Sequence, residues 1–169
     1  MKHFALTPFR QQGSMLLEAL IAILIFSVGV IAMIGLQAAS VKLSSDAKYR
    51  SDASMLANQV IGQMWVSNRT PAALQTNFQG GGGTNGSAYT AWASGVAAAL
   101  PGVAGIPANQ PTISVSAVIP TAPATNSSSL VTIRLFWKSP SESGSTTTMC
   151  NGVTNPSAAH CYIATAQIL

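Results

Sequence analysis

The longest apolar stretch of the chain covers residues 19–36, and Ser27 contributes its only polar side chain. Its 18 residues reach the minimum length of a membrane-spanning helix. Glu18 stands immediately before the stretch, and the next charge along the chain is Lys42. The pattern predicts a transmembrane helix with one carboxylate at its beginning.

The helical pattern continues well beyond the apolar stretch. No proline occurs between Ser14 and Pro71, so nothing interrupts a single helix before about Val66 or Ser67. In its second half, apolar residues recur at helical spacing and predict a stripe that a domain must cover. The stripe consists of Ala53, Leu56, Ala57, Val60, Ile61 and Met64.

Shorter elements are expected after Pro71. A glycine-rich stretch, residues 79–87, predicts a loop, and residues 89–100 predict a short helix that Pro101-Gly102 ends. Alternating apolar and polar positions then predict strands, as does the chain's final segment. These strands cover residues 112–119, 130–137 and 162–169. The expected fold class is therefore α+β, with a long N-terminal helix packed against a small antiparallel sheet.

Glu18 requires a partner if its helix lies in an apolar environment. A charged side chain inside a membrane segment costs about 2.5–3.5 kcal/mol even on the lenient insertion scale. Cleavage of the chain after Gly13 would create a new ammonium at Ser14, four residues before Glu18. This spacing suggests a source for the missing positive charge.

These residues carry a resemblance. A short basic leader ending in Gly13, followed by Glu18 and a long apolar helix, resembles the class III signal peptides of type IV pilins and of type II secretion pseudopilins. The resemblance implies that prepilin peptidase cuts between Gly13 and Ser14 and N-methylates Ser14, although the family usually has Phe there. It also implies a leader at 1–13, a transmembrane or filament-core helix at 14–40, and a periplasmic headgroup at 41–169.

A second resemblance concerns the headgroup. Trp92 followed by Leu100-Pro101-Gly102 is similar to an element of PilV-like minor pilins, and residues 64–69 resemble the end of their long helix. The implied function is a minor pilin needed for assembly or initiation of a type IV pilus and for the associated motility or adhesion. The implied partners are prepilin peptidase, other major and minor pilins, and the inner membrane before assembly. The implied final location is the pilus or cell surface.

Other interpretations of the helix remain open. It could be an ordinary secretory signal cleaved near Ala38-Ala39-Ser40, although the apolar region is long for one and Glu18 is out of place. It could also be a plain membrane anchor whose Glu18 reaches the interface. A type II secretion pseudopilin shares every feature of the first 67 residues. A membrane-anchored adhesin would use the Ser/Thr/Asn-rich loops as its contact surface.

The two cysteines, Cys150 and Cys161, are 11 residues apart. Behind an export-competent segment they predict a disulfide in an oxidising periplasm. The alternatives are two free thiols or half of a metal site with His160. His3 is the only other histidine, so a zinc ligand set is incomplete and no metal is expected.

Composition argues against several classes of function. The formal charge is +4 and falls to +2 without residues 1–13, and the basic residues form no stripe, so nucleic-acid binding is not expected. The four acids show no spacing typical of acid–base catalysis, and no G-x-S-x-G motif occurs. Three acids, Glu18, Asp46 and Asp52, lie on the long helix, and Glu142 lies in a Ser/Gly-rich loop. We therefore expect neither an enzyme nor a cofactor.

Overall fold

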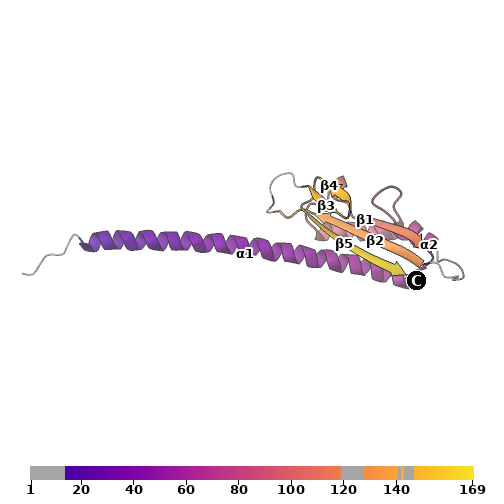
Figure 1. Cartoon of the computed structure of the whole chain (residues 1–169), viewed down its shortest axis with the longest axis horizontal. Coiled ribbons are helices and arrows are strands. Elements are labelled where there is room, and N and C mark those ends of the chain that lie inside the picture. Colours follow the sequence, from indigo (N-terminus) through magenta and orange to yellow (C-terminus); the bar gives the residue numbers. More distant parts are fainter. Residues whose placement is uncertain (1–13, 119–127, 141, 143–146) are drawn as a thin grey trace, which may run out of the picture. The chain divides into compact units, whose positions relative to one another are not determined.

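The computed structural model describes residues 14–118, 128–140, 142 and 147–169 (Figure 1). The predicted α+β fold is confirmed: a long N-terminal helix, α1, packs through its second half against a small antiparallel sheet. The helices are α1 (Ser14–Val66), α2 (Pro71–Phe78), α3 (Ser87–Ala99) and the 3-10 helix η1 (Pro107–Asn109). The strands are β1 (Thr112–Val118), β2 (Ser128–Trp137), β3 (Thr148–Cys150), β4 (Val153–Asn155) and β5 (His160–Ile168).

The long helix ends where the sequence predicts. α1 is continuous from Ser14 to Val66, and Pro71 follows after a short connection. The chain divides into two units, residues 1–43 and residues 44–169, and α1 contributes to both. Each unit is described by itself below, and the second is called the headgroup.

The headgroup sheet has three antiparallel strands in the order β1-β2-β5. Its register pairs Ile113 with Ile133 and Val131 with Ala166. Strands were predicted at these three places, and the observed ends differ from the predicted ones by at most two residues. Ile119, where the first strand was predicted to end, lies outside the described residues.

One face of the sheet packs on α1. Alternate residues of β2, namely Val131, Ile133, Leu135 and Trp137, are buried in the main core. The predicted stripe supplies the opposite wall, because all of its members are buried except Ile61, which is partly buried. Burying apolar surface stabilises the fold by about 25 cal/mol per Å², so this contact is a main source of headgroup stability.

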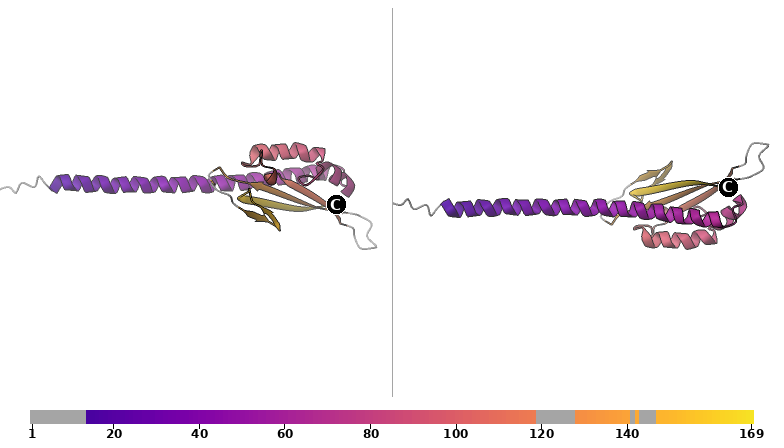
Figure 2. Two further views of the ribbon diagram at one scale, coloured as in Figure 1. Left: turned by 90° about the horizontal axis from the view of Figure 1, so that it is seen from above. Right: turned by 90° about the horizontal axis from the view of Figure 1, so that it is seen from below.

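Two further helices complete this layer. Figure 2 shows α3 beside the second half of α1, and Trp92 and Val96 of α3 enter the same core. The sequence analysis missed α2, which begins with Pro71 at a position where the missing N–H is tolerated. Its Leu74 and Phe78 are buried in the main core. The carboxamide of Gln75 donates a hydrogen bond of 3.0 Å to the carbonyl of Val115 in β1.

The opposite face of the sheet carries a small second core. Phe136 points away from α1 and packs with Cys150 and Ala158. The strands β3 and β4 form a separate two-stranded hairpin that supplies Cys150. This hairpin was not predicted.

Candidate assembly helix and headgroup contacts

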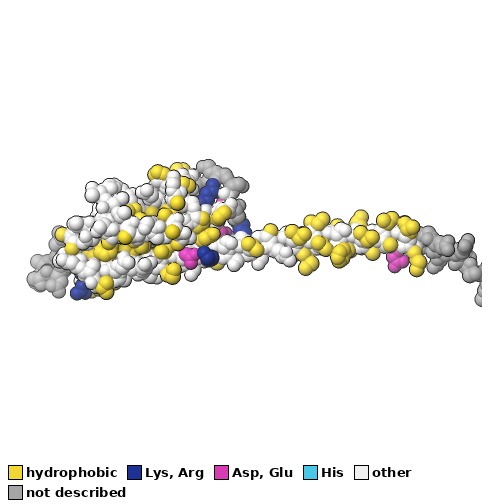
Figure 3. Space-filling model, turned by 180° about the vertical axis from the view of Figure 1, so that it is seen from behind, with side chains coloured by type: hydrophobic (Ala, Val, Ile, Leu, Met, Phe, Trp, Pro, Cys, Tyr) yellow, Lys and Arg dark blue, Asp and Glu magenta, His cyan; other side chains and the backbone are white. Residues whose placement is uncertain are grey.

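The first half of α1 presents apolar side chains in every direction. Its large hydrophobic residues from Met15 to Leu36 are 39–77% exposed, and Figure 3 shows hydrophobic side chains along this part of the helix. By length and composition, α1 is the one helix of the described residues that is able to cross a membrane. Such a surface is stable only in lipid or against other apolar helices.

Glu18 is the only charged residue of this apolar segment, residues 14–41. Its side chain is exposed, and it forms no hydrogen bond or ion pair with the described residues. Ser27 differs, because its hydroxyl donates 2.7 Å to the carbonyl of Ile23 and is satisfied within its own helix. Glu18 is therefore the one side chain here that needs a partner from outside the described part of the chain.

The predicted processing site lies at the boundary of what is described. Gly13 lies outside the described residues, and α1 begins at Ser14. Cleavage between these residues and methylation of Ser14 stay predictions. The structure does place Ser14 and Glu18 four residues apart, about one turn, on one continuous helix.

The Trp92…Leu100-Pro101-Gly102 element has a structural role in the headgroup. The indole Nε1 of Trp92 donates a hydrogen bond of 2.9 Å to the carbonyl of Leu56 in α1, and Leu100 is buried. Gly102 has a positive φ of 72°, and a Cβ there would crowd the backbone of Lys138. The element thus fixes α3 on α1 and turns the chain past the end of β2.

Four polar residues meet where α1 faces the start of β5, a group we call the Asp46 cluster. The Nε2 atom of His160 lies 3.0 Å from Glu142 Oε1 and 4.0 Å from Asp46 Oδ1. The Ser139 hydroxyl donates 2.8 Å to Asp46 Oδ1, and the Ser139 amide donates 3.1 Å to Glu142 Oε2. The ring of His160 stacks on Trp137 with centroids 5.4 Å apart.

The hydrogen bonds of the Asp46 cluster link α1 to the sheet, and their order differs from that of a nucleophilic triad. In a nucleophilic triad the serine hydroxyl bonds to the imidazole, whereas here Ser139 donates to Asp46 instead. Both carboxylates approach the same imidazole nitrogen of His160. Among the described residues, no group of three or more His, Cys, Asp or Glu is placed to hold a metal ion.

Sequence reasoning missed this cluster. The sequence pattern places Asp46 among the acids of the long helix and gives no sign that it contacts His160. Ser139 and Asp46 are 93 residues apart, so no spacing in the sequence signals their contact. Only Ser139 and Glu142, three residues apart, form a local turn that a capping-type pattern could have suggested.

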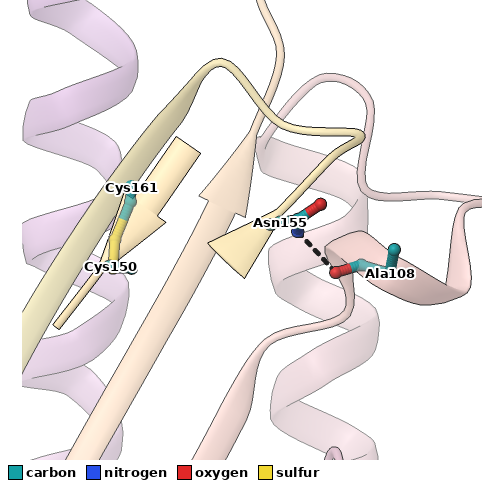
Figure 4. The surroundings of a disulfide bond; sticks show 4 residues. All are labelled: Ala108, Cys150, Asn155 and Cys161. Carbon is teal, nitrogen blue, oxygen red and sulfur yellow. Dashed lines mark hydrogen bonds between the residues drawn. A yellow bond between two sulfur atoms is a disulfide. The ribbon is translucent and has the colours of Figure 1, made fainter. Parts of the chain in front are cut away.

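Cys150 and Cys161 form a disulfide, as predicted (Figure 4). Their Cα atoms are 6.0 Å apart, and the bond attaches β3 to β5. A buried amide contact holds the other strand of the hairpin: Asn155 Nδ2 donates to the carbonyl of Ala108 at 2.6 Å and to Asn109 Oδ1 at 3.0 Å. The hairpin is therefore fixed at both of its strands.

Comparison with protein-family models, with curated proteins and with solved structures found no match.

Proposed function

We propose that this chain is a minor pilin of a type IV pilus, of the PilV-like kind. The observation that carries the proposal is Glu18, a lone carboxylate without a partner among the described residues, at the start of a helix whose first half has exposed apolar side chains all round. An anchor needs the apolar helix, but it does not need the carboxylate. A subunit that assembles through this helix does need it.

The proposed mechanism is exchange of one apolar environment for another. The apolar segment first holds the chain in the inner membrane, with the headgroup in the periplasm, and prepilin peptidase removes residues 1–13. The helix then leaves the bilayer and packs with like helices of other pilins in a filament core. Packing of this kind needs no net hydrophobic gain, because lipid and helices are similarly apolar.

Glu18 makes assembly selective in this mechanism. The ammonium at Ser14 of the processed chain would be neutralised by Glu18 of a neighbouring subunit. A buried carboxylate and a buried ammonium are each costly alone, and the cost falls only when the pair forms together. Subunits that pack out of register leave both charges unpaired.

The headgroup supports a structural role. The Asp46 cluster contains a serine, a histidine and two carboxylates, but its hydrogen bonds hold α1 to the sheet and do not activate the serine. We therefore propose that the chain is not an enzyme and needs no cofactor. Its partners would be prepilin peptidase, other pilins and the inner membrane.

Deleting the gene and restoring it in trans tests the proposal. We expect the deletion to abolish or reduce surface pili and twitching motility while general protein secretion continues, and the restored wild-type gene to reverse both defects. Lost export of secreted enzymes with pili intact would instead identify a type II secretion pseudopilin. Unchanged pili with lost attachment would identify an adhesin.

A further inference from the structure

A small cleft lies beside the sheet, on the face that does not contact α1. Its volume is about 250 Å³. One wall is the glycine-rich loop, residues 79–84, and the other includes Val153 of β4. Thr112, Ser114 and Arg134 from β1 and β2 also line it.

Two residues that line this cleft each have a buried polar atom without a partner among the described residues. Thr112 and Arg134 stand directly opposite each other as register partners of β1 and β2. The Oγ1 atom of Thr112 and the Nε atom of Arg134 are both buried, and neither forms a hydrogen bond with the described residues. Buried polar groups normally have partners, and an unpaired one costs about 1–3 kcal/mol.

No carboxylate of the headgroup is positioned to pair with this guanidinium. The sequence contains four acids. Asp46 and Glu142 belong to the Asp46 cluster, and Asp52 pairs with Lys48 at 2.9 Å. Glu18 lies in the apolar segment, and no acid lines the cleft. The natural partner of an arginine is thus missing from the site.

The loop wall adds hydrogen-bond donors. The loop is held in place by a pair of backbone bonds between Gly80 and Ile113, of 3.0 and 3.1 Å. A bond of 3.0 Å from the Gly81 amide to Asn85 Oδ1 closes it further. The next amides, at residues 82–84, form no hydrogen bond with the described residues and remain available as donors.

A cleft of this composition suits an acceptor-rich anion. The planar guanidinium edge formed by Nε and a terminal nitrogen matches the two oxygens of a carboxylate. The exposed surface of the lining is mainly apolar, and Thr84, Ser114 and Gln79 add hydroxyl and carboxamide groups to it, a mixture that suits a ring with C–H faces and hydroxyl groups. The volume is slightly below the range of drug-sized ligand pockets, about 300–1,000 Å³.

We propose that this cleft binds an acidic sugar residue through its carboxylate. On binding, Arg134 would turn to hold the carboxylate side-on, Thr112 would rotate to donate its hydroxyl to it, and the loop amides would contact the sugar oxygens. This binding does not depend on filament assembly, so it stands or falls independently of the proposed function.

Titration of the full chain in detergent micelles with galacturonate tests the proposal by calorimetry. We expect saturable binding that weakens as ionic strength rises, and no binding of galactose, which lacks the carboxylate. Arg134→Gln should weaken binding at least about tenfold, the loss of one charge-assisted hydrogen bond. Arg69→Gln removes an exposed arginine elsewhere and should leave the affinity unchanged.

Two conservative variants separate recognition from folding. Arg134→Lys keeps the charge but loses the planar edge, and Thr112→Val keeps the shape but loses the hydroxyl; both should bind galacturonate several-fold more weakly with an unchanged circular dichroism spectrum. Failure of the wild-type chain to bind galacturonate would overturn the proposal. Wild-type affinity for galacturonate in all three cleft variants would overturn it as well. Binding of glutarate without galacturonate would overturn the assignment to a sugar.

Discussion

The indole of Trp92 donates a hydrogen bond to the backbone carbonyl of Leu56, 36 residues earlier, at 2.9 Å. Both residues are buried in the main core. Leu56 belongs to the stripe of α1, and Trp92 is the central buried residue of α3. This hydrogen bond therefore fixes the position of α3 on α1, in addition to the apolar packing between the two helices.

Replacing Trp92 by phenylalanine should destabilise the headgroup by about 1–3 kcal/mol, because the change removes the hydrogen bond and leaves a cavity. Trp65 provides a matched control, since it is 41% exposed. Trp65→Phe should change the free energy of unfolding by less than about 0.5 kcal/mol. Denaturant unfolding followed by circular dichroism measures both. Equal effects of the two substitutions would contradict the role of the contact.

The main helix and the sheet were predictable because their signals are periodic and local. The apolar stripe of α1 repeats at helical spacing, and β2 alternates between apolar and polar residues from Val131 to Leu135. The hairpin of β3 and β4 was missed because each strand has only three residues. Its signal was nonetheless present: Asn151-Gly152, with φ values of 46° and 80°, is typical of a tight hairpin turn.

The polar contacts of the headgroup were not predictable. Asp46, Ser139 and His160 come from a helix, a loop and a strand that only the folded topology brings together. The same holds for Thr112 and Arg134, which became neighbours through the register of β1 and β2. Periodicity predicts which face of an element is buried, but it does not predict which polar residues of distant elements meet.

Tyr89 should make the headgroup sensitive to alkaline pH. Its hydroxyl donates 2.6 Å to the carbonyl of Pro111, and burial raises the pKa of Tyr89 above its ordinary value of 10.0. Below that pH the tyrosine is neutral in both the folded and the unfolded state, so its contribution to the free energy of unfolding is fully present. As pH rises above it, the unfolded state ionises first, and stability is lost as pH approaches the folded-state pKa.

Unfolding midpoints measured from about pH 8 to 11 test this dependence. Tyr89→Phe should lower stability at neutral pH by about 1 kcal/mol, through loss of the hydrogen bond, and should make the decline above pH 10 shallower. An identical alkaline decline in the variant and the wild type would show that Tyr89 is not the responsible group.

The disulfide should stabilise the carboxyl-terminal part of the headgroup. Closing a loop of this size contributes about 3 kcal/mol in the chain-entropy model, and the bond fixes β3 to β5. Cys161→Ser should therefore lower the free energy of unfolding by about 2–5 kcal/mol. Reduced wild-type protein should lose a similar amount. Complete alkylation of both cysteines without reductant would rule out the bond.

Glu18→Ala should block or weaken incorporation of the chain into pili while leaving removal of the leader intact. The carboxylate has no partner among the described residues, and the proposal assigns it to a neighbouring subunit. Ser27→Ala is the control, because that hydroxyl is already satisfied within its own helix. Immunoblotting of sheared pili measures both variants. Normal amounts of the Glu18 variant in pili would remove the basis of the assembly mechanism.

The most direct test of the account is the intact mass of the protein extracted from membranes. We predict a chain that begins at Ser14, with a methyl increment of about 14 Da if the new terminus is modified. Gly13→Val should retain the leader and add its mass. A chain that begins at Ser40 or Val41 would establish an ordinary secretory signal, and an unprocessed chain would establish a plain anchor. Either result would contradict the assignment to the pilin class.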